Sequence, residues 1–285
     1  MGPAAEPDLE PRHFEAVARG GNVLRGEASG TGPAVVQAHG ITAARKYVTH
    51  GSKLLQRRGL TAVAYDARGH GESGPAPAGE GYEYPELARD MGAVVESQSP
   101  EPRVVIAGHS MGAHTGAAYT LANSDRVAGL VAIGPSSRGT PVSDESIAYW
   151  DRLADGLESD GVDGFMLAFE DMLDADPNWR ETVLRFTRER MEQHRHPQAV
   201  ADALRGMPRS QPFDGLTELE SLDLPALVVA SHDDADPAHP YAVAEAWAQA
   251  IPGATFVSEE EGEAPLAWQG GKLAREIAEF CERLG

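Results

Sequence analysis

The segment G-H-S-M-G at residues 108–112 carries the clearest chemical signal in this chain of 285 residues. A serine with a glycine two positions away on each side is typical of a nucleophile elbow, a sharp turn between a strand and a helix. An apolar run, R-V-V-I-A, precedes this segment, and a helical sequence, A-H-T-G-A-A-Y, follows it. A Cβ atom at Gly108 or Gly112 would clash with neighbouring backbone, while the strained turn projects the Ser110 hydroxyl above the sheet edge. We therefore expect Ser110 to attack a carbonyl carbon.

Two further segments have residue types that could support such a nucleophile. H-G-I at residues 39–41 ends the apolar run A-V-V-Q-A, and we expect the Ile41 N–H and the Met111 N–H to face a developing oxyanion. D-A-R-G-H-G-E-S at residues 66–73 is a glycine-rich turn that we expect beside the elbow. His70 within it is expected to form structural hydrogen bonds and to take no catalytic part.

The elements that must position these residues alternate between short β-branched runs and amphipathic helical stretches. This alternation predicts an α/β protein whose mostly parallel central sheet is flanked by helices on both faces. A hairpin is expected within residues 13–29. The other expected strands are 34–38, 61–65, 103–107, 127–133, 226–230 and 254–257, and the expected helices are about 45–58, 84–98, 111–122, 240–250 and 268–284.

The alternation stops between Pro135 and about Gly215, where three apolar helical segments follow one another without a strand between them. This pattern predicts an all-helical cap at residues 136–215, inserted into a core made of residues 1–135 and 216–285. Such a cap would close over the serine and limit the access of water.

The three motifs, in this order and spacing, resemble the α/β-hydrolase fold family, and the resemblance covers nearly the whole core. It implies an acid on a loop after a late strand, commonly in an Asp-Pro sequence that leads into a helix ending in I-P-G-A. Asp236 matches best, because D-P-A-H-P runs into a helix that reaches residues 251–254. Asp233 fits a shorter loop and is the alternative. Of Asp233, Asp234 and Asp236, at least two are expected to be solvated or to cap the helix.

The chain departs from the family pattern at the general base. The resemblance implies a histidine after the final strand, but Glu263 stands there, and the last histidine of the chain is His239. An ordinary carboxylate is too weak a base for a serine hydroxyl. One hypothesis is that Glu263 shares an apolar site with Asp236, where repulsion and burial raise one carboxyl pKa.

The other hypothesis takes the base from a histidine elsewhere. His114 lies one helical turn beyond Ser110, and His194 or His196 could reach the site from the cap. His109 is expected to point away from the elbow. Each of these side chains could instead be an ordinary core or surface histidine.

These features predict an enzyme without a cofactor that hydrolyses an ester, a lactone or a C–C bond in a small apolar carbonyl compound. The alternatives are a non-hydrolytic lyase, isomerase or cyclase that uses the Asp236–Glu263 pair, and a degenerate ligand-binding protein. No Walker sequence occurs, and the one G-x-G-x-x-G match, at residues 69–74, lies in the glycine-rich turn and opens no predicted helix, so no nucleotide cofactor is implied. The cluster from His232 to His239 has metal-binding residue types, but neighbours in sequence rarely face one centre, so we expect no metal.

Charge and composition exclude several classes of partner. The chain has 24 Lys and Arg against 44 Asp and Glu, a net charge of −20, which repels nucleic acid and anionic membranes. Cys281 is the only cysteine, so no intramolecular disulfide is possible. There is neither a signal-peptide pattern nor an apolar run long enough for a membrane span. We expect a cytoplasmic protein with a small-molecule substrate, and the sequence does not determine whether it is a monomer or a homodimer.

Overall fold

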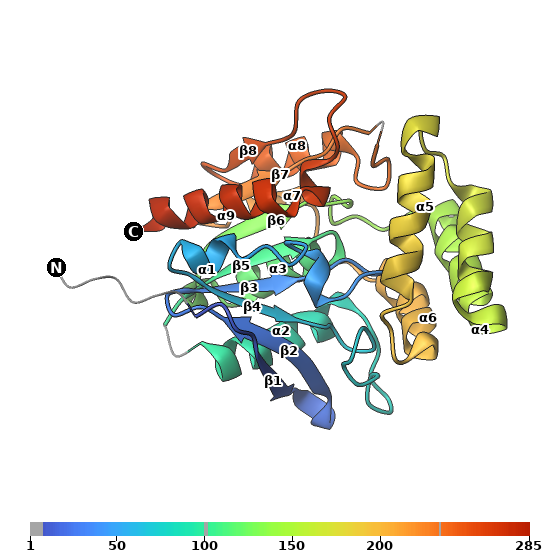
Figure 1. Cartoon of the computed structure of the whole chain (residues 1–285), viewed down its shortest axis with the longest axis horizontal. Coiled ribbons are helices and arrows are strands. Elements are labelled where there is room, and N and C mark those ends of the chain that lie inside the picture. Colours follow the sequence, from blue (N-terminus) through green and yellow to red (C-terminus); the bar gives the residue numbers. More distant parts are fainter. Residues whose placement is uncertain (1–7, 100–101, 234) are drawn as a thin grey trace.

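The computed structural model describes residues 8–99, 102–233 and 235–285, which form an eight-stranded sheet with helices on both faces (Figure 1). The strand order is β1-β2-β4-β3-β5-β6-β7-β8. β1 and β2 pair antiparallel, β2 pairs antiparallel with β4, and all remaining pairs are parallel. The strands are β1 Arg12–Val17, β2 Val23–Ser29, β3 Ala34–Ala38, β4 Thr61–Tyr65, β5 Val104–His109, β6 Val127–Ile133, β7 Ala226–Val229 and β8 Thr255–Val257.

The apolar runs of the central strands feed two separate cores, because alternate residues of a strand face opposite sides of the sheet. Val36 and Ile106 pack beneath α2, α3 and α8, whereas Val35 and Val105 pack beneath α1 and α9. The helices are α1 Leu54–Arg57, α2 Tyr84–Gln98, α3 Met111–Ala122, α4 Asp144–Met172, α5 Pro177–Met191, α6 Pro197–Gly206, α7 Leu216–Leu219, α8 Tyr241–Ala250 and α9 Gly270–Leu284. The fold class expected from the sequence is confirmed.

α4, α5 and α6 follow one another between β6 and β7, and Figure 1 shows them packed together beyond one end of the sheet. We call these three helices the cap. α4 reverses direction at Asp160 and Gly161, where Gly161 has a φ of +59°. Its two arms touch through glycines: a Cβ on Gly164 would lie 2.1 Å from the Gly156 carbonyl oxygen. The absence of both side chains therefore lets the arms pack against each other.

One expected helix is wrong in its extent. Residues 45–58 were predicted as one helix, but the chain forms a 3₁₀ turn at Arg45–Tyr47 and then the short α1. Between them His50 and Gly51 have φ values of +48° and +74°, which a right-handed helix does not allow. This break brings His50 to the rim of the site described below.

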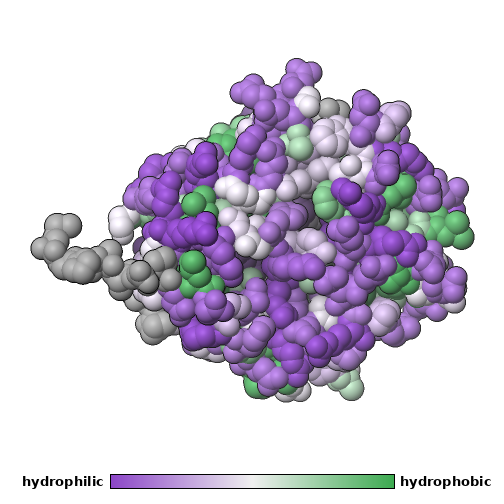
Figure 2. Space-filling model, viewed as in Figure 1, coloured by the Kyte–Doolittle hydropathy of each residue, from purple (hydrophilic) through white to green (hydrophobic). Residues whose placement is uncertain are grey.

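The visible surface is largely hydrophilic, with small separate hydrophobic patches (Figure 2). This agrees with the large excess of acidic residues, 44 Asp and Glu against 24 Lys and Arg. Within the described ranges, no helix combines the length and the hydropathy that crossing a bilayer requires.

Candidate active site

Ser110 occupies the turn between β5 and α3 with φ 53° and ψ −116°, a strained conformation for a residue with a side chain. Glycine is required on both sides of it. A Cβ on Gly108 would lie 2.1 Å from the Gly112 carbonyl oxygen, and one on Gly112 would lie 2.1 Å from the Ala38 carbonyl oxygen. The close approach of β3, β5 and α3 therefore holds Ser110 in the geometry of a nucleophile elbow.

The loop after β3 is fixed by buried histidines. His39 Nε2 accepts a hydrogen bond from the Ala67 N–H at 2.9 Å, and Nδ1 donates to the Gly40 carbonyl at 2.8 Å. Burial lowers the pKa of His39 to about 3, which keeps the ring neutral as this pattern requires. His70 Nε2 lies 2.6 Å from the Ile41 carbonyl oxygen and donates to it, as the structural role expected for His70 implies.

These contacts orient the loop that carries Ile41. In the described part of the chain, neither the Ile41 N–H nor the Met111 N–H has a hydrogen-bond acceptor. Ile41 lines the large cavity described below, and the Met111 N–H begins α3, where the helix dipole is positive. Both amides are therefore available to a negatively charged oxygen.

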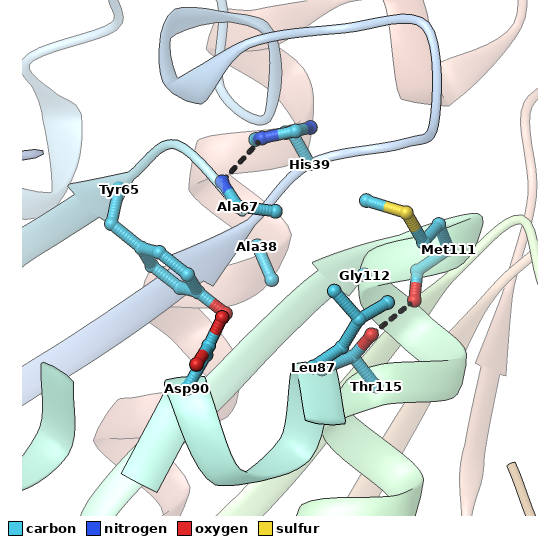
Figure 3. A pocket seen from close by; sticks show the side chains of 9 residues that line it. All are labelled: Ala38, His39, Tyr65, Ala67, Leu87, Asp90, Met111, Gly112 and Thr115. Carbon is cyan, nitrogen blue, oxygen red and sulfur yellow. Dashed lines mark hydrogen bonds between the residues drawn. The ribbon is translucent and has the colours of Figure 1, made fainter. Parts of the chain in front are cut away.

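A small void lies beneath the first turn of α3 (Figure 3). Its volume is about 10 Å³, which suits one water molecule and no organic substrate. Met111, Gly112 and Thr115 border it on one side, and Tyr65 and Asp90 extend toward it from β4 and α2. This void lies among the side chains that pack against the elbow, and its lining residues differ from those of the substrate cavity.

The substrate cavity is about 630 Å³ and lies between the cap and the edge of the sheet that carries Ser110. Such a volume accommodates a small organic molecule. Ser110 lies on the core side, next to the loop of residues 40–43. The aromatic residues that line the cavity are Tyr47, Tyr84, Tyr149, Trp150, Phe165, Phe169, Phe186 and Trp268.

The loop after β7 contributes an acid and an imidazole to this cavity. Asp236 is 8% exposed, and its Oδ2 lies 2.9 Å from His239 Nδ1. Burial raises the pKa of Asp236, but attraction to His239 and the hydrogen bond with it outweigh this effect and leave the pKa below its ordinary value. Asp233 instead accepts a hydrogen bond from the Tyr241 N–H at 2.7 Å and caps α8, and Asp234 lies outside the described residues.

His239 lies close to the elbow backbone. A Cβ on Gly134 would be 3.3 Å from His239 Cγ, and the preceding residue, Ile133, accepts a hydrogen bond from the Ser110 N–H at 2.9 Å. In the described part of the structure, the Ser110 hydroxyl has no hydrogen-bond partner. His239 is not among the site residues expected from the sequence, although the D-x-x-H spacing in residues 236–239 could have indicated it.

His109 lies at the same place, with its ring centroid 4.9 Å from that of His239. The expectation that His109 points away from the site is wrong, because its side chain lines the cavity. Its Nε2 is buried without a hydrogen-bond partner. Burial, above all, lowers the pKa of His109 well below its ordinary value, so the ring is neutral.

The structure contradicts the position expected for Glu263. This residue is exposed, its carboxylate lies 3.2 Å from Lys272 Nζ, and it does not line the cavity. The reason is an anchor four residues earlier: the buried carboxylate of Glu259 accepts hydrogen bonds from the His232 and Leu266 N–H groups, both at 2.7 Å. The residues between Glu259 and Leu266 therefore turn outward, and the Asp236–Glu263 carboxyl pair does not form.

The histidines considered as alternative bases either accept hydrogen bonds from backbone N–H groups or are exposed and do not line the cavity. His114 lines the cavity, but its Nε2 accepts from the Ser136 and Ser137 N–H groups, both at 3.2 Å, and its Nδ1 lies 3.1 Å from the Tyr84 hydroxyl. Burial lowers the pKa of His114 to about 3. The buried His194 accepts from the Gly71 N–H at 2.9 Å, and His196 is exposed just before α6.

Among the described residues, His109, Asp236 and His239 have the spacing that a metal ion would require, with one ligand atom each within 4.8 Å of the others. A metal would compete with the hydrogen bond between Asp236 and His239. The wider cluster considered from the sequence does not converge, because His232 stacks on Tyr241 and Asp233 caps α8.

Comparison with known proteins agrees with this architecture. Residues 33–270 match the family described as alpha/beta hydrolase fold, and the chain belongs to this family. Among curated relatives, the sn-1-specific diacylglycerol lipase ABHD11 of Mus musculus is 32% identical over 42% of this chain and 37% of its own length. The monoacylglycerol lipase of Mycolicibacterium smegmatis is 29% identical over 71% of this chain and 69% of its own length.

Solved structures extend the similarity to nearly the whole chain. A thermophilic esterase from Thermogutta terrifontis, with malate bound, has a TM-score of 0.79 at 24% identity and covers 96% of this chain and 99% of its own. The enol-lactonase from Burkholderia xenovorans LB400 has a TM-score of 0.74 at 21% identity, covering 95% and 99%. At these identities the likeness concerns the fold.

Proposed function

We propose that this protein is a serine hydrolase that cleaves an ester or lactone bond in a small, largely apolar compound. The observation that carries the proposal is the strained Ser110 at the floor of a cavity that also holds the Asp236–His239 pair. The names of the relatives support this class, since they include lipases, an esterase and an enol-lactonase. The aromatic walls of the cavity favour an apolar substrate.

In this proposal His239 is the general base that replaces the histidine missing after β8. Its Nδ1–H donates to Asp236, which leaves Nε2 as the acceptor for the Ser110 proton. Asp236 fixes this tautomer and stabilises the imidazolium that forms. The neutral ring of His109 packs beside His239 and helps to fix its orientation.

The reaction then follows from these positions. The Ser110 oxygen attacks the carbonyl carbon while His239 takes the hydroxyl proton, and the Ile41 and Met111 N–H groups bind the oxyanion. His239 returns the proton to the leaving alkoxide, and the C–O bond of the ester breaks to give an acyl-enzyme. Water then attacks this acyl group with His239 again as base, releasing the acid and restoring the Ser110 hydroxyl.

Labelling and hydrolysis assays on single variants test the proposal. A fluorophosphonate should label the wild type and not Ser110→Ala, and Ser110→Ala should lose hydrolysis of 4-nitrophenyl butyrate. His239→Gln should lower kcat by about 10²- to 10⁴-fold, the usual contribution of a positioned general base, and Asp236→Asn should also lower it. Circular dichroism and urea unfolding would show whether each variant is folded.

Matched controls separate the alternatives. Glu263→Gln and His196→Gln should retain wild-type activity, because both side chains are exposed away from the cavity. A loss in Glu263→Gln would contradict the assignment of the base. If His109→Gln lost as much activity as His239→Gln, the base would be unassigned between the two imidazoles. A folded wild type that binds substrate analogues without labelling or turnover would identify a ligand-binding protein and overturn the proposed function.

A further inference from the structure

Arg190, on α5, lines the substrate cavity and forms no ion pair with any described residue. It lines the same cavity as Ser110, and of the described lining residues it is the only arginine or lysine. Its Nη2 donates to the Thr187 hydroxyl at 3.0 Å, and its Nε is buried without a hydrogen-bond partner. In the described part of the chain, no carboxylate lies within ion-pair distance of it.

This isolation is unusual for the cap, which belongs to a chain with 44 acidic residues against 24 basic ones. Four other cap arginines, and Arg209 just after α6, pair with carboxylates on the outer surface, whereas the exposed Arg185 lies over the Phe186 ring. The pairs are Arg152 with Asp171, Arg180 with Glu170, Arg188 with Asp163, Arg205 with Asp155 and Glu158, and Arg209 with Asp151. A guanidinium that is kept from such partners and directed into a cavity is costly unless a ligand supplies the missing charge.

The neighbouring groups do not supply that charge. Asp236 attracts Arg190 across the cavity, but its carboxylate is bonded to His239. Glu145 and Asp174 also line the cavity but are exposed. Burial lowers the pKa of Arg190, yet a guanidinium remains protonated at neutral pH.

We propose that Arg190 binds a carboxylate of the substrate, so that the enzyme acts on small esters or lactones carrying one anionic group. A carboxylate matches the planar donor geometry of a guanidinium and supplies the charge that the neighbouring side chains do not. One negative charge balances one cation, whereas Glu145 and Asp174 disfavour more highly charged anions. The inference rests on the proposed function, since it concerns the substrate of the same serine.

A pair of matched substrates tests it: phenyl hydrogen adipate, with a free carboxylate, and methyl phenyl adipate, its neutral counterpart. Phenol release should show a preference of the wild type for the acid. Arg190→Gln should lower kcat/KM for the acid about ten- to hundredfold, mainly through KM, as expected for loss of a charge-assisted hydrogen bond. It should change kcat/KM for the neutral ester by less than about threefold. Arg190→Lys should recover part of the preference, because it restores charge without the planar donor pair.

Arg188→Gln is the matched control, because Arg188 lies on the same helix but pairs with Asp163 on the exposed surface. It should leave both rates unchanged. An equal loss on both substrates in Arg190→Gln would overturn the inference and identify Arg190 as a residue that positions Asp236. Equal rates of the wild type on the two substrates would also overturn it.

A binding measurement separates failure of this inference from failure of the proposed function. Calorimetry on Ser110→Ala, which should not turn over the ester, gives the Kd of phenyl hydrogen adipate directly. Ser110→Ala/Arg190→Gln should bind it at least about tenfold more weakly. If the wild type hydrolyses neither ester but this difference in Kd is present, Arg190 is an anion-binding residue in a protein whose proposed hydrolysis is wrong. Unchanged Kd values would overturn the inference whatever the activity.

Discussion

Replacing Gly112 with alanine tests whether the close approach of β3 and α3 holds the nucleophile in place. The added Cβ would lie 2.1 Å from the Ala38 carbonyl oxygen, and also 2.9 Å from the His39 carbonyl oxygen. Real Cβ atoms essentially never approach another heavy atom within 3.0 Å, so the backbone of β3 or α3 must move by about 1 Å. Neither carbonyl can swing aside, because both belong to the main chain that leads into the Ile41 loop.

Two opposing effects set the magnitude of the change in stability. Alanine at a helix position is favoured over glycine by up to about 1 kcal/mol. Overpacking against fixed backbone costs about 1–3 kcal/mol, and a clash as close as this belongs at the upper end. We therefore expect Gly112→Ala to lower the free energy of unfolding by about 1–2 kcal/mol. The effect on chemistry should be larger, because misplacing a reacting group by about 1 Å costs about a hundredfold in rate.

The assay combines urea unfolding with the rate of fluorophosphonate labelling, measured under conditions where the variant is fully folded. Gly92→Ala is the matched control: Gly92 lies within α2, and its added Cβ would meet only Tyr119 Cε2 at 3.4 Å. This control should be as stable as the wild type or more so, and should be labelled at the same rate. A Gly112→Ala protein with wild-type stability and labelling would refute the argument that the glycine is needed for steric reasons.

Two further predictions concern buried ionisable side chains. Arg68 is fully buried and donates hydrogen bonds to Asp90 through Nε at 2.7 Å and Nη2 at 2.8 Å. Arg68→Met should lower the free energy of unfolding in urea by about 3–5 kcal/mol, because it leaves the buried Asp90 carboxylate without its partner. A change below about 1 kcal/mol would contradict this. His114 has a folded-state pKa of about 3 against an ordinary 6.5, so the unfolded chain binds its proton first and stability is lost as the pH falls below 6.5. The excess stability of the wild type over His114→Gln should therefore shrink between pH 7 and pH 4, and a constant difference would show that His114 titrates normally.

Local sequence predicts the parts of this site that depend on local geometry. The strands at 34–38, 61–65 and 127–133 and the helices at 84–98 and 111–122 have the limits expected from the sequence. The elbow can be predicted from the glycine spacing around Ser110, because the residues that satisfy the steric demand of the turn all lie within residues 108–112. Asp236 was expected from the resemblance to the family, because its Asp-Pro sequence and following helix match the family pattern, and the structure places it on the loop after β7.

The base could not be predicted in this way, because its position depends on contacts between distant segments. Glu263 has the right place in the order of the chain, but Glu259 bonds to the His232 and Leu266 N–H groups and turns the following residues away. Nothing in the run of glutamates distinguishes the one that is buried. The resemblance does not point to His239, since it places the base after β8 and His239 comes before that strand.

The topology is compatible with the proposal that a histidine from the loop after β7 serves Ser110. β5, β6, β7 and β8 are parallel neighbours in that order, so their carboxyl ends meet at one edge of the sheet. In this chain Asp236 and His239 are three residues apart on the β7 loop, and their hydrogen bond forms within one turn. Their relative geometry is then set locally, and the remaining requirement is that this single loop packs against Gly134 beside Ser110. Residues 260–263 of the loop after β8 are exposed and do not line the cavity, whereas Trp268, further along the same segment, does.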